Sequence, residues 1–247
     1  RDAEGKPGRL VLSGNPAQLD IPSDAATGAR RAVSQDFEAT LVAGGLSRVT
    51  VPGPLVFSES AAAPRAGATT VPAARRLTAG SGQLTFGADG RSIETAVLGG
   101  GVTLSEGTHL TVRAPRASLR GVDESAVFAG SVENPARYED EKAKVSATVL
   151  TWFRRDDRIE GAGSVKTSFR GGEGSEILGG GSERPVFSES DFLRVTPSER
   201  KVLLTGNVTA WQEENVLRAQ SLLVDDRERS LRAEGNVRAV LRRRRVD

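Results

Sequence analysis

Hydrophobic and polar residues alternate with a period of two along several stretches of this chain. In the clearest stretch, residues 230–241, every second position from 231 is apolar or glycine, and the positions between, up to Arg238, are Ser, Arg, Glu and Asn. The same phase occurs in residues 202–210 and 159–169. Alternation over eight or more positions is typical of strands with one apolar and one polar face, and it differs from helical spacing.

A repeated pattern links these stretches. A hydrophobic residue is followed two positions later by Ala and, sixteen positions after that Ala, by Gly-x-Val. Three copies share this spacing: Val112/Ala114 with Gly130/Val132, Val145/Ala147 with Gly163/Val165, and Leu217/Ala219 with Gly235/Val237. Each copy predicts two antiparallel strands, joined by short polar turns such as residues 154–158 and 225–229. Glycine permits a bend or a close backbone approach, so a curled sheet or jelly roll is expected.

Two segments interrupt the repeats. Residues 58–78 are rich in Ala, Pro and Gly, and residues 171–185 include three consecutive glycines. Both are predicted to be long loops. They divide the chain into an N-terminal β-repeat part (1–57), central β-repeats (79–170) and a last block of β-repeats (186–247) that is expected to continue the central part.

The composition narrows the possible functions. The 247 residues carry a net charge of +2, contain no cysteine and are 4% aromatic. Disulfides and cysteine chemistry are therefore excluded, and neither a strongly basic surface nor a stacking platform for nucleic acid is expected. A run of four arginines, residues 242–245, is interpreted as a solvated tail, with contact to lipid phosphates as the alternative. No apolar run is long enough to span a bilayer as a helix.

The sequence contains few candidate catalytic or metal-binding residues. His109 is the single histidine, so we expect it to be a surface residue, and a site with two histidine ligands is impossible. The acidic clusters 139–141 and 156–157 lie among arginines at predicted turns, where solvated turn residues are the better interpretation. We therefore expect no enzyme activity, no cofactor and no metal.

A long segment carries a family resemblance. Residues 202–226, Val-Leu-Leu-Thr-Gly-Asn-Val-Thr-Ala-Trp-Gln-Glu-Glu-Asn-Val-Leu-Arg-Ala-Gln-Ser-Leu-Leu-Val-Asp-Asp, and residues 231–237, Leu-Arg-Ala-Glu-Gly-Asn-Val, resemble the OstA-like repeat of the periplasmic lipopolysaccharide-transport proteins LptA and LptC. The fit is good over residues 186–241 and moderate over 98–169. It is brief at 10–16 and poor at 47–78.

The resemblance implies an open β-jelly roll that shields the acyl chains of lipid A in an apolar groove and bridges the inner and outer membrane machinery. It also implies a periplasmic location, with a membrane anchor possible in a segment absent from this chain. Expected partners are lipopolysaccharide and other jelly-roll transport proteins, joined by edge-strand addition, with head-to-tail self-association possible. No nucleic-acid partner is expected. The expected groove residues are Leu98, Val102, Leu104, Phe128, Val132, Ile159, Val165, Phe169, Val202, Leu204, Val208, Ala210, Leu231, Val237, Ala239 and Leu241.

The alternation alone leaves another interpretation open. Any β-sandwich alternates in this way to form its own core. A structural or adhesive β-repeat protein with a dry core is therefore the alternative function.

Overall fold

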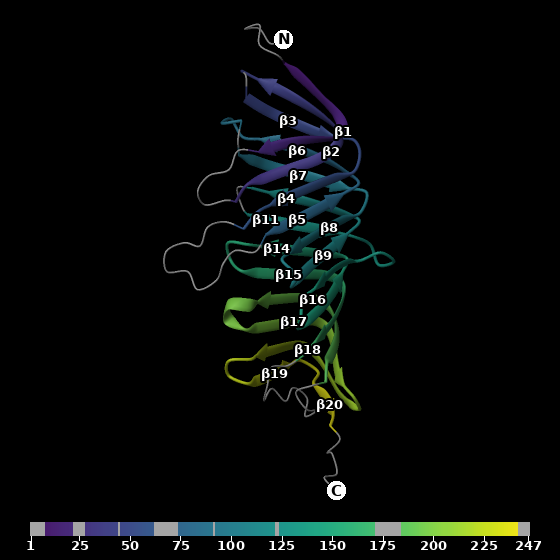
Figure 1. Ribbon diagram of the computed structural model, residues 1–247. Helices are drawn as coiled ribbons and strands as arrows, with labels where there is room; N and C mark the ends of the chain where they lie inside the picture. Colours follow the sequence, from purple (N-terminus) through teal and green to yellow (C-terminus); the bar gives the residue numbers. More distant parts are fainter. Residues whose placement is uncertain are drawn as a thin grey trace. The chain divides into compact units, whose positions relative to one another are not determined.

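The computed structural model describes residues 8–21, 28–43, 45–61, 74–90, 92–121, 124–170 and 184–241. These residues form antiparallel strands and one short 3-10 helix, Pro197–Glu199. The predicted all-β fold of curled antiparallel sheets is confirmed. Within the described ranges, no helix has the length and apolar character needed to cross a membrane. The chain divides into two compact units, residues 1–126 and 127–247, and Figure 1 labels most of their strands.

Unit 1 contains ten complete strands. They are β1 (Arg9–Ile21), β2 (Arg30–Val42), β3 (Gly45–Val51), β4 (Leu55–Glu59), β5 (Arg75–Ala79), β6 (Ser81–Phe86), β7 (Ile93–Gly99), β8 (Val102–Glu106), β9 (Leu110–Ala114) and β10 (Arg116–Arg120). β11 (Ser125–Ala129) spans the division between the units.

The pairings of unit 1 define two layers. In layer 1A, the second half of β2 lies between the first half of β1 and β3, and β6, β7 and β10 follow. In layer 1B, the first half of β2 lies between the second half of β1 and β4, and β5, β8 and β9 follow. β1 and β2 thus belong to both layers, and β1 bends at a register shift between Ser13 and Ala17.

The remaining strands of unit 1 change layer at tight corners. The chain passes from β3 to β4 at residues 52–54, from β5 to β6 at Gly80, from β7 to β8 at Gly100 and Gly101, and from β9 to β10 at Pro115. Two of these corners touch, because the Gly80 amide donates to the Gly99 carbonyl oxygen at 2.8 Å. The layers are therefore joined at one end of their strands, and the opposite strand ends are the open side of unit 1.

Unit 2 contains nine strands: β12 (Ala136–Glu139), β13 (Ala143–Ala147), β14 (Val149–Phe153), β15 (Arg158–Phe169), β16 (Val186–Thr196), β17 (Lys201–Gln212), β18 (Asn215–Asp225), β19 (Ser230–Glu234) and β20 (Arg238–Val240). Layer 2A comprises β14, the first halves of β15 and β17, the second halves of β16 and β18, and β19. Layer 2B comprises β12, β13, the complementary halves of β15 to β18, and β20. The predicted turns at residues 154–158 and 225–229 join β14 to β15 and β18 to β19.

The glycines of the sequence repeat occupy the corners of unit 2. Gly163, Gly206 and Gly235 have φ angles of +77°, +77° and +73°, and each is followed by a Ser or Asn that is also left-handed. A β-carbon on Gly206 would lie 2.7 Å from the Asp191 β-carbon, so the corner has no room for a side chain. Glycine is therefore required here both by conformation and by space.

Hydrogen bonds explain the sixteen-residue spacing from Ala to Gly. The amide of Thr148, which follows Ala147, donates to the Gly163 carbonyl oxygen at 2.8 Å. The amide of Gln220, which follows Ala219, donates to the Gly235 carbonyl oxygen at the same distance. Sixteen residues is therefore the length of chain that runs from the Ala at one corner, through a turn, and back to the Gly that pairs beside that corner.

Three sequence-based expectations need correction. Val132 was placed on an apolar strand face, but it lies in the bend between β11 and β12 and is 68% exposed. Leu231, Val237 and Leu241 are also exposed, because β19 and β20 pair only with β18 among the described strands. The loop expected at 58–78 is shorter, since residues 58–59 belong to β4 and residues 75–78 to β5. Residues 62–73 and 171–183 lie outside the described residues, as does the arginine run.

Candidate functional site

Unit 1 holds an apolar cavity of about 100 Å³ between its two layers. All the side chains that line it are hydrophobic. They come from both layers: Leu19, Ile21, Ala32, Phe37, Val49, Leu55, Phe57, Leu77, Leu84, Phe86, Ile93, Ala96, Leu98 and Leu119. A cavity with such a lining stays dry and accepts apolar ligands, as engineered cavities of about 150 Å³ do.

Strand register produces this lining. On layer 1A, Ala96 of β7 pairs with Leu84 of β6 on one side and with Leu119 of β10 on the other. On layer 1B, Phe57 of β4 lies between Ala32 of β2 and Leu77 of β5. Directly opposed residues point to the same face of a sheet. Because an alanine reaches only to its β-carbon, these rows leave space between bulkier neighbours.

Four charged residues follow the apolar rows of layer 1B. Arg30, Glu59, Arg75 and Glu106 lie on adjacent strands, in direct register, and we call them the Arg–Glu ladder. Arg30 Nε donates to Glu59 at 3.2 Å, Arg75 Nε and Nη2 donate to the two oxygens of Glu106 at 3.2 Å, and Arg75 Nη1 lies 3.8 Å from Glu59. The side chains are 17–25% exposed, so the ladder is half-buried.

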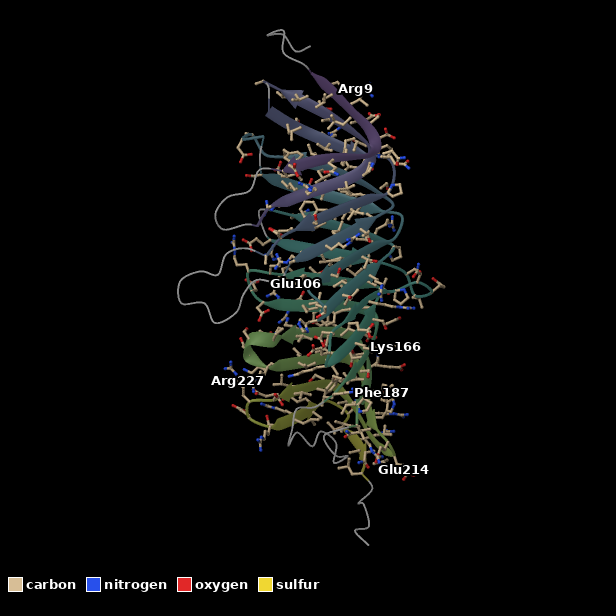
Figure 2. All side chains as sticks on the ribbon, in the orientation of Figure 1. Arg9, Glu106, Lys166, Phe187, Glu214 and Arg227 are labelled. Carbon is tan, nitrogen blue, oxygen red and sulfur yellow. The ribbon has the colours of Figure 1, made fainter. Side chains whose placement is uncertain are left out.

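The position of the ladder relates it to the cavity. Arg30, Glu59 and Arg75 are each two residues from a cavity-lining side chain of the same strand, namely Ala32, Phe57 and Leu77. Residues two apart share a face of the sheet, so the ladder continues the inner face. It lies at the open side of unit 1, where Figure 2 labels Glu106 at the end of β8. An open cleft of about 610 Å³ lies over these strand ends, and Arg30, Glu59 and Arg75 contribute to its wall.

The interior of unit 2 differs in chemistry. Leu193, Leu204 and Val208 are at most 2% exposed, as expected for a packed core. Unit 2 also buries polar groups: the hydroxyls of Thr167 and Ser188 are 2.6 Å apart, and Gln212 and Asn215 are buried. Gln212 Nε2 donates to the Arg184 carbonyl oxygen at 2.9 Å. The inner face of layer 2B is thus partly polar.

The predicted groove residues are distributed over both units. Leu98 lines the unit 1 cavity. The other buried members are Val102, Leu104, Phe128, Ile159, Val165, Leu204, Val208 and Ala210, and Phe169 and Val202 are half-buried. Val132, Leu231, Val237, Ala239 and Leu241 are exposed. Whether any of them contacts lipid stays a prediction.

Sequence reasoning missed most of the cavity wall. The glycine repeat fits poorly between residues 47 and 78, and it therefore gives no signal for the walls contributed by β2 to β6. A usable signal was present, since Leu84 and Phe86 alternate with polar residues in the same way as the selected residues. The stacked rings of Phe187 and Trp211, with centroids 5.8 Å apart on neighbouring strands, were also missed.

The catalytic candidates lie in surface turns. His109 is exposed in the turn after β8, as predicted. Asp140 of the first acidic cluster accepts hydrogen bonds from the backbone amides of Lys142 and Ala143, and Asp157 of the second accepts one from the amide of Ser198. These carboxylates therefore cap turns. Across the described ranges, no three His, Cys, Asp or Glu side chains cluster in a way that could hold a metal ion.

These features define a class of protein: an all-β chain with curled antiparallel layers and, in unit 1, an apolar cavity between them. No protein-family model matches the sequence, and no curated protein is significantly similar to it. A similar solved structure is LptH of Pseudomonas aeruginosa, described as the LptA-homologous periplasmic component of the conserved lipopolysaccharide transport device. The two share 12% identity and a TM-score of 0.45, over 54% of this chain and 95% of LptH.

Proposed function

We propose that this chain is a non-catalytic lipid-binding protein of the periplasm that shields the acyl chains of lipopolysaccharide during transport between the membranes. The observation that carries the proposal is the wholly apolar cavity between layers 1A and 1B. The resemblance of residues 202–237 to the OstA-like repeat supports the choice of lipopolysaccharide as the lipid.

Acyl chains that cross water need an apolar cover, and each buried CH₂ group is worth about 0.8 kcal/mol. The cavity of about 100 Å³ accepts a few methylene groups as it stands. Longer stretches of acyl chain require the layers to separate at the open side, where no corner joins them. A wall of Leu, Phe and Ala makes no directional contacts, which favours release as well as binding.

The edges of the sheets support the expected partners. Among the described strands, β1 pairs only with β2, and β19 and β20 pair only with β18. These edge strands carry exposed apolar side chains, including Leu10, Val11 and Val240. Unpaired strand edges are sites for strand addition. We therefore propose that other jelly-roll transport proteins, or further copies of this chain, add at these edges.

Site-specific photo-crosslinking tests the proposed function. A photoactivatable phenylalanine analogue would replace Phe86 in the cavity wall or, as a control, Val97, which is 60% exposed on the outer face of layer 1A. Purified lipopolysaccharide should cross-link at position 86 and not at position 97. Equal labelling at both positions, or labelling at position 97 alone, would refute the proposal. The same probe at Leu204 and Val208 tests whether unit 2 also contacts lipid.

A structural role is the second candidate, and the interior of unit 2 favours it. The hydrogen-bonded pair Thr167–Ser188 and the nearly complete burial of Leu193 and Leu204 are features of a core that is packed for stability. Absence of cross-links from every inner position would favour this structural candidate.

A further inference from the structure

We infer that the outer face of layer 2B is a docking surface for an anionic lipid bilayer. In this docking, Phe187 and Trp211 enter the region between the lipid head groups and the acyl chains, and arginines beside them bind lipid phosphates. The inference goes beyond the proposed function and does not rest on it, because it concerns the outer face of unit 2 and not the cavity of unit 1.

An apolar row crosses this outer face. Its members lie on adjacent strands in direct register: Phe187 of β16, Trp211 of β17, Val216 of β18 and Val240 of β20. Their neighbours along β16 to β18 are buried, so the row points away from the interior. Phe187 is 38% exposed and Val240 59%, and Figure 2 labels Phe187. Since strands lie about 4.8 Å apart, the row is roughly 14 Å long.

A polar row with two arginines runs parallel to the apolar row. Two residues further along the same strands, Arg218 of β18 pairs with Arg238 of β20, and Thr209 of β17 pairs with Arg218. Both arginines are exposed, and neither has an ion-pair or hydrogen-bond partner among the described residues. Two residues of a strand span about 7 Å, which places both guanidinium groups close to the row of rings and valines.

The carboxylates around these rows are already engaged. Their partners are as follows: Glu189 pairs with Lys166 at 3.0 Å, Glu213 pairs with Arg184, Asp191 accepts a hydrogen bond from Asn207, and Glu214 is not free. The free charges beside the apolar row are therefore positive. In the sequence, the arginine run 242–245 begins two positions after Val240 and adds four charges of the same sign.

An anionic bilayer matches both properties of this face. Tryptophan is favoured at the level of the lipid head groups, and surfaces that bind bilayers combine Trp and Phe with Lys and Arg. Guanidinium groups bind phosphates through two parallel hydrogen bonds. A sugar would stack on one ring and would gain nothing from Val216 and Val240, which continue the row past the rings. The length and the charge of the surface therefore favour a bilayer as its occupant.

Tryptophan fluorescence of the full chain tests whether Trp211 enters a bilayer. The chain has two tryptophans, so Trp152→Phe leaves Trp211 as the only emitter. Vesicles of phosphatidylglycerol with brominated acyl chains should shift its emission to shorter wavelength and quench it. Trp211→Phe is the matched control, because it leaves Trp152, which lies two residues from the buried Leu150 and so faces the interior. The emission of Trp152 should not change.

Vesicle sedimentation tests the role of the arginines. Each basic residue near an anionic surface strengthens binding about 5-fold, so Arg218→Gln/Arg238→Gln should bind phosphatidylglycerol vesicles roughly 30-fold more weakly than the wild type. The control Arg48→Gln/Arg120→Gln removes the same charge from exposed positions on layer 1A and should bind like the wild type. Vesicles of phosphatidylcholine alone should bind weakly to all three proteins. Thermal unfolding verifies that each variant is folded.

Several results would overturn the inference. They are absence of binding to phosphatidylglycerol vesicles, equal binding to phosphatidylcholine, equal losses in the two double variants, and binding without quenching of Trp211. Quenching of Trp152 alone would mean that lipid enters between the layers. An emission of Trp211 that shifts with protein concentration in the absence of vesicles would assign the row to a contact between copies of this chain. None of these results bears on the unit 1 cavity, which cross-linking at position 86 tests separately.

Discussion

Ala96→Leu is the sharpest test of whether acyl chains use the unit 1 cavity. Ala96 is 6% exposed and lies between Leu84 and Leu119 on the inner face of layer 1A. The substitution adds three carbon atoms at this position. They would occupy space inside a cavity of about 100 Å³ that a ligand otherwise fills.

The magnitude follows from the displaced methylene groups. If three CH₂ groups of the ligand lose their place at about 0.8 kcal/mol each, the affinity falls by about 2.4 kcal/mol, which is roughly 60-fold. Stability should change little, because new apolar burial of similar size is offset by overpacking that costs about 1–3 kcal/mol. A net change within about 1 kcal/mol corresponds to a shift in Tm of less than about 4 °C.

Fluorescence titration with a labelled acyl lipid measures the affinity, and thermal unfolding measures the stability. Ser118→Leu is the control, because Ser118 lies on the exposed outer face of layer 1A, opposite Val97 in β7. This control should bind lipid like the wild type. If Ala96→Leu is folded and also binds like the wild type, acyl chains do not use this cavity.

Two further predictions concern stability. Gly206→Ala places a β-carbon on a left-handed backbone and also brings it against Asp191. Gly101→Ala has only the strain of the left-handed backbone, since nothing lies within 4 Å of its added β-carbon. In thermal or denaturant unfolding Gly101→Ala should cost about 1–2 kcal/mol and Gly206→Ala more, and equal costs would contradict the clash. Thr167→Val should cost about 1–3 kcal/mol because it leaves the Ser188 hydroxyl unpaired, and adding Ser188→Ala should recover most of the loss. A double variant no more stable than Thr167→Val would show that the pair does not act as a unit.

The fold was predictable because its signals are local. Alternation gives strand faces directly, and the polar segments at 154–158 and 225–229 are turns in the structure. The repeat glycines were expected to permit bends, and Gly163, Gly206 and Gly235 do lie at corners where strands change layer or the chain turns back. Spacing alone could not show that β1 and β2 extend through both layers of unit 1.

The candidate site was less predictable because a cavity depends on non-local register. Ala96 opens space only because Leu84 and Leu119 are its neighbours across two strand pairs, and no sequence spacing encodes both. The Arg–Glu ladder was hidden for the same reason. Its four members are spread over residues 30–106 and become adjacent only in the sheet. The sequence also does not show which strands lie at the edge of a sheet. Leu231 and Val237 follow the apolar alternation and are nevertheless exposed.

The two interiors differ in what they offer an acyl chain. In unit 1, the row Ala32–Phe57–Leu77 is apolar across three strands, so every contact with a methylene group removes apolar surface from water. In unit 2, the corresponding kind of row includes Thr167 and Ser188, whose hydroxyls satisfy each other and add little to apolar binding. Acyl chains should therefore prefer unit 1. If Ala96→Leu lowers the affinity for the acyl lipid by much more than about 60-fold, unit 1 is the principal acyl site. Its layers then cannot separate enough to hold both the leucine and the ligand.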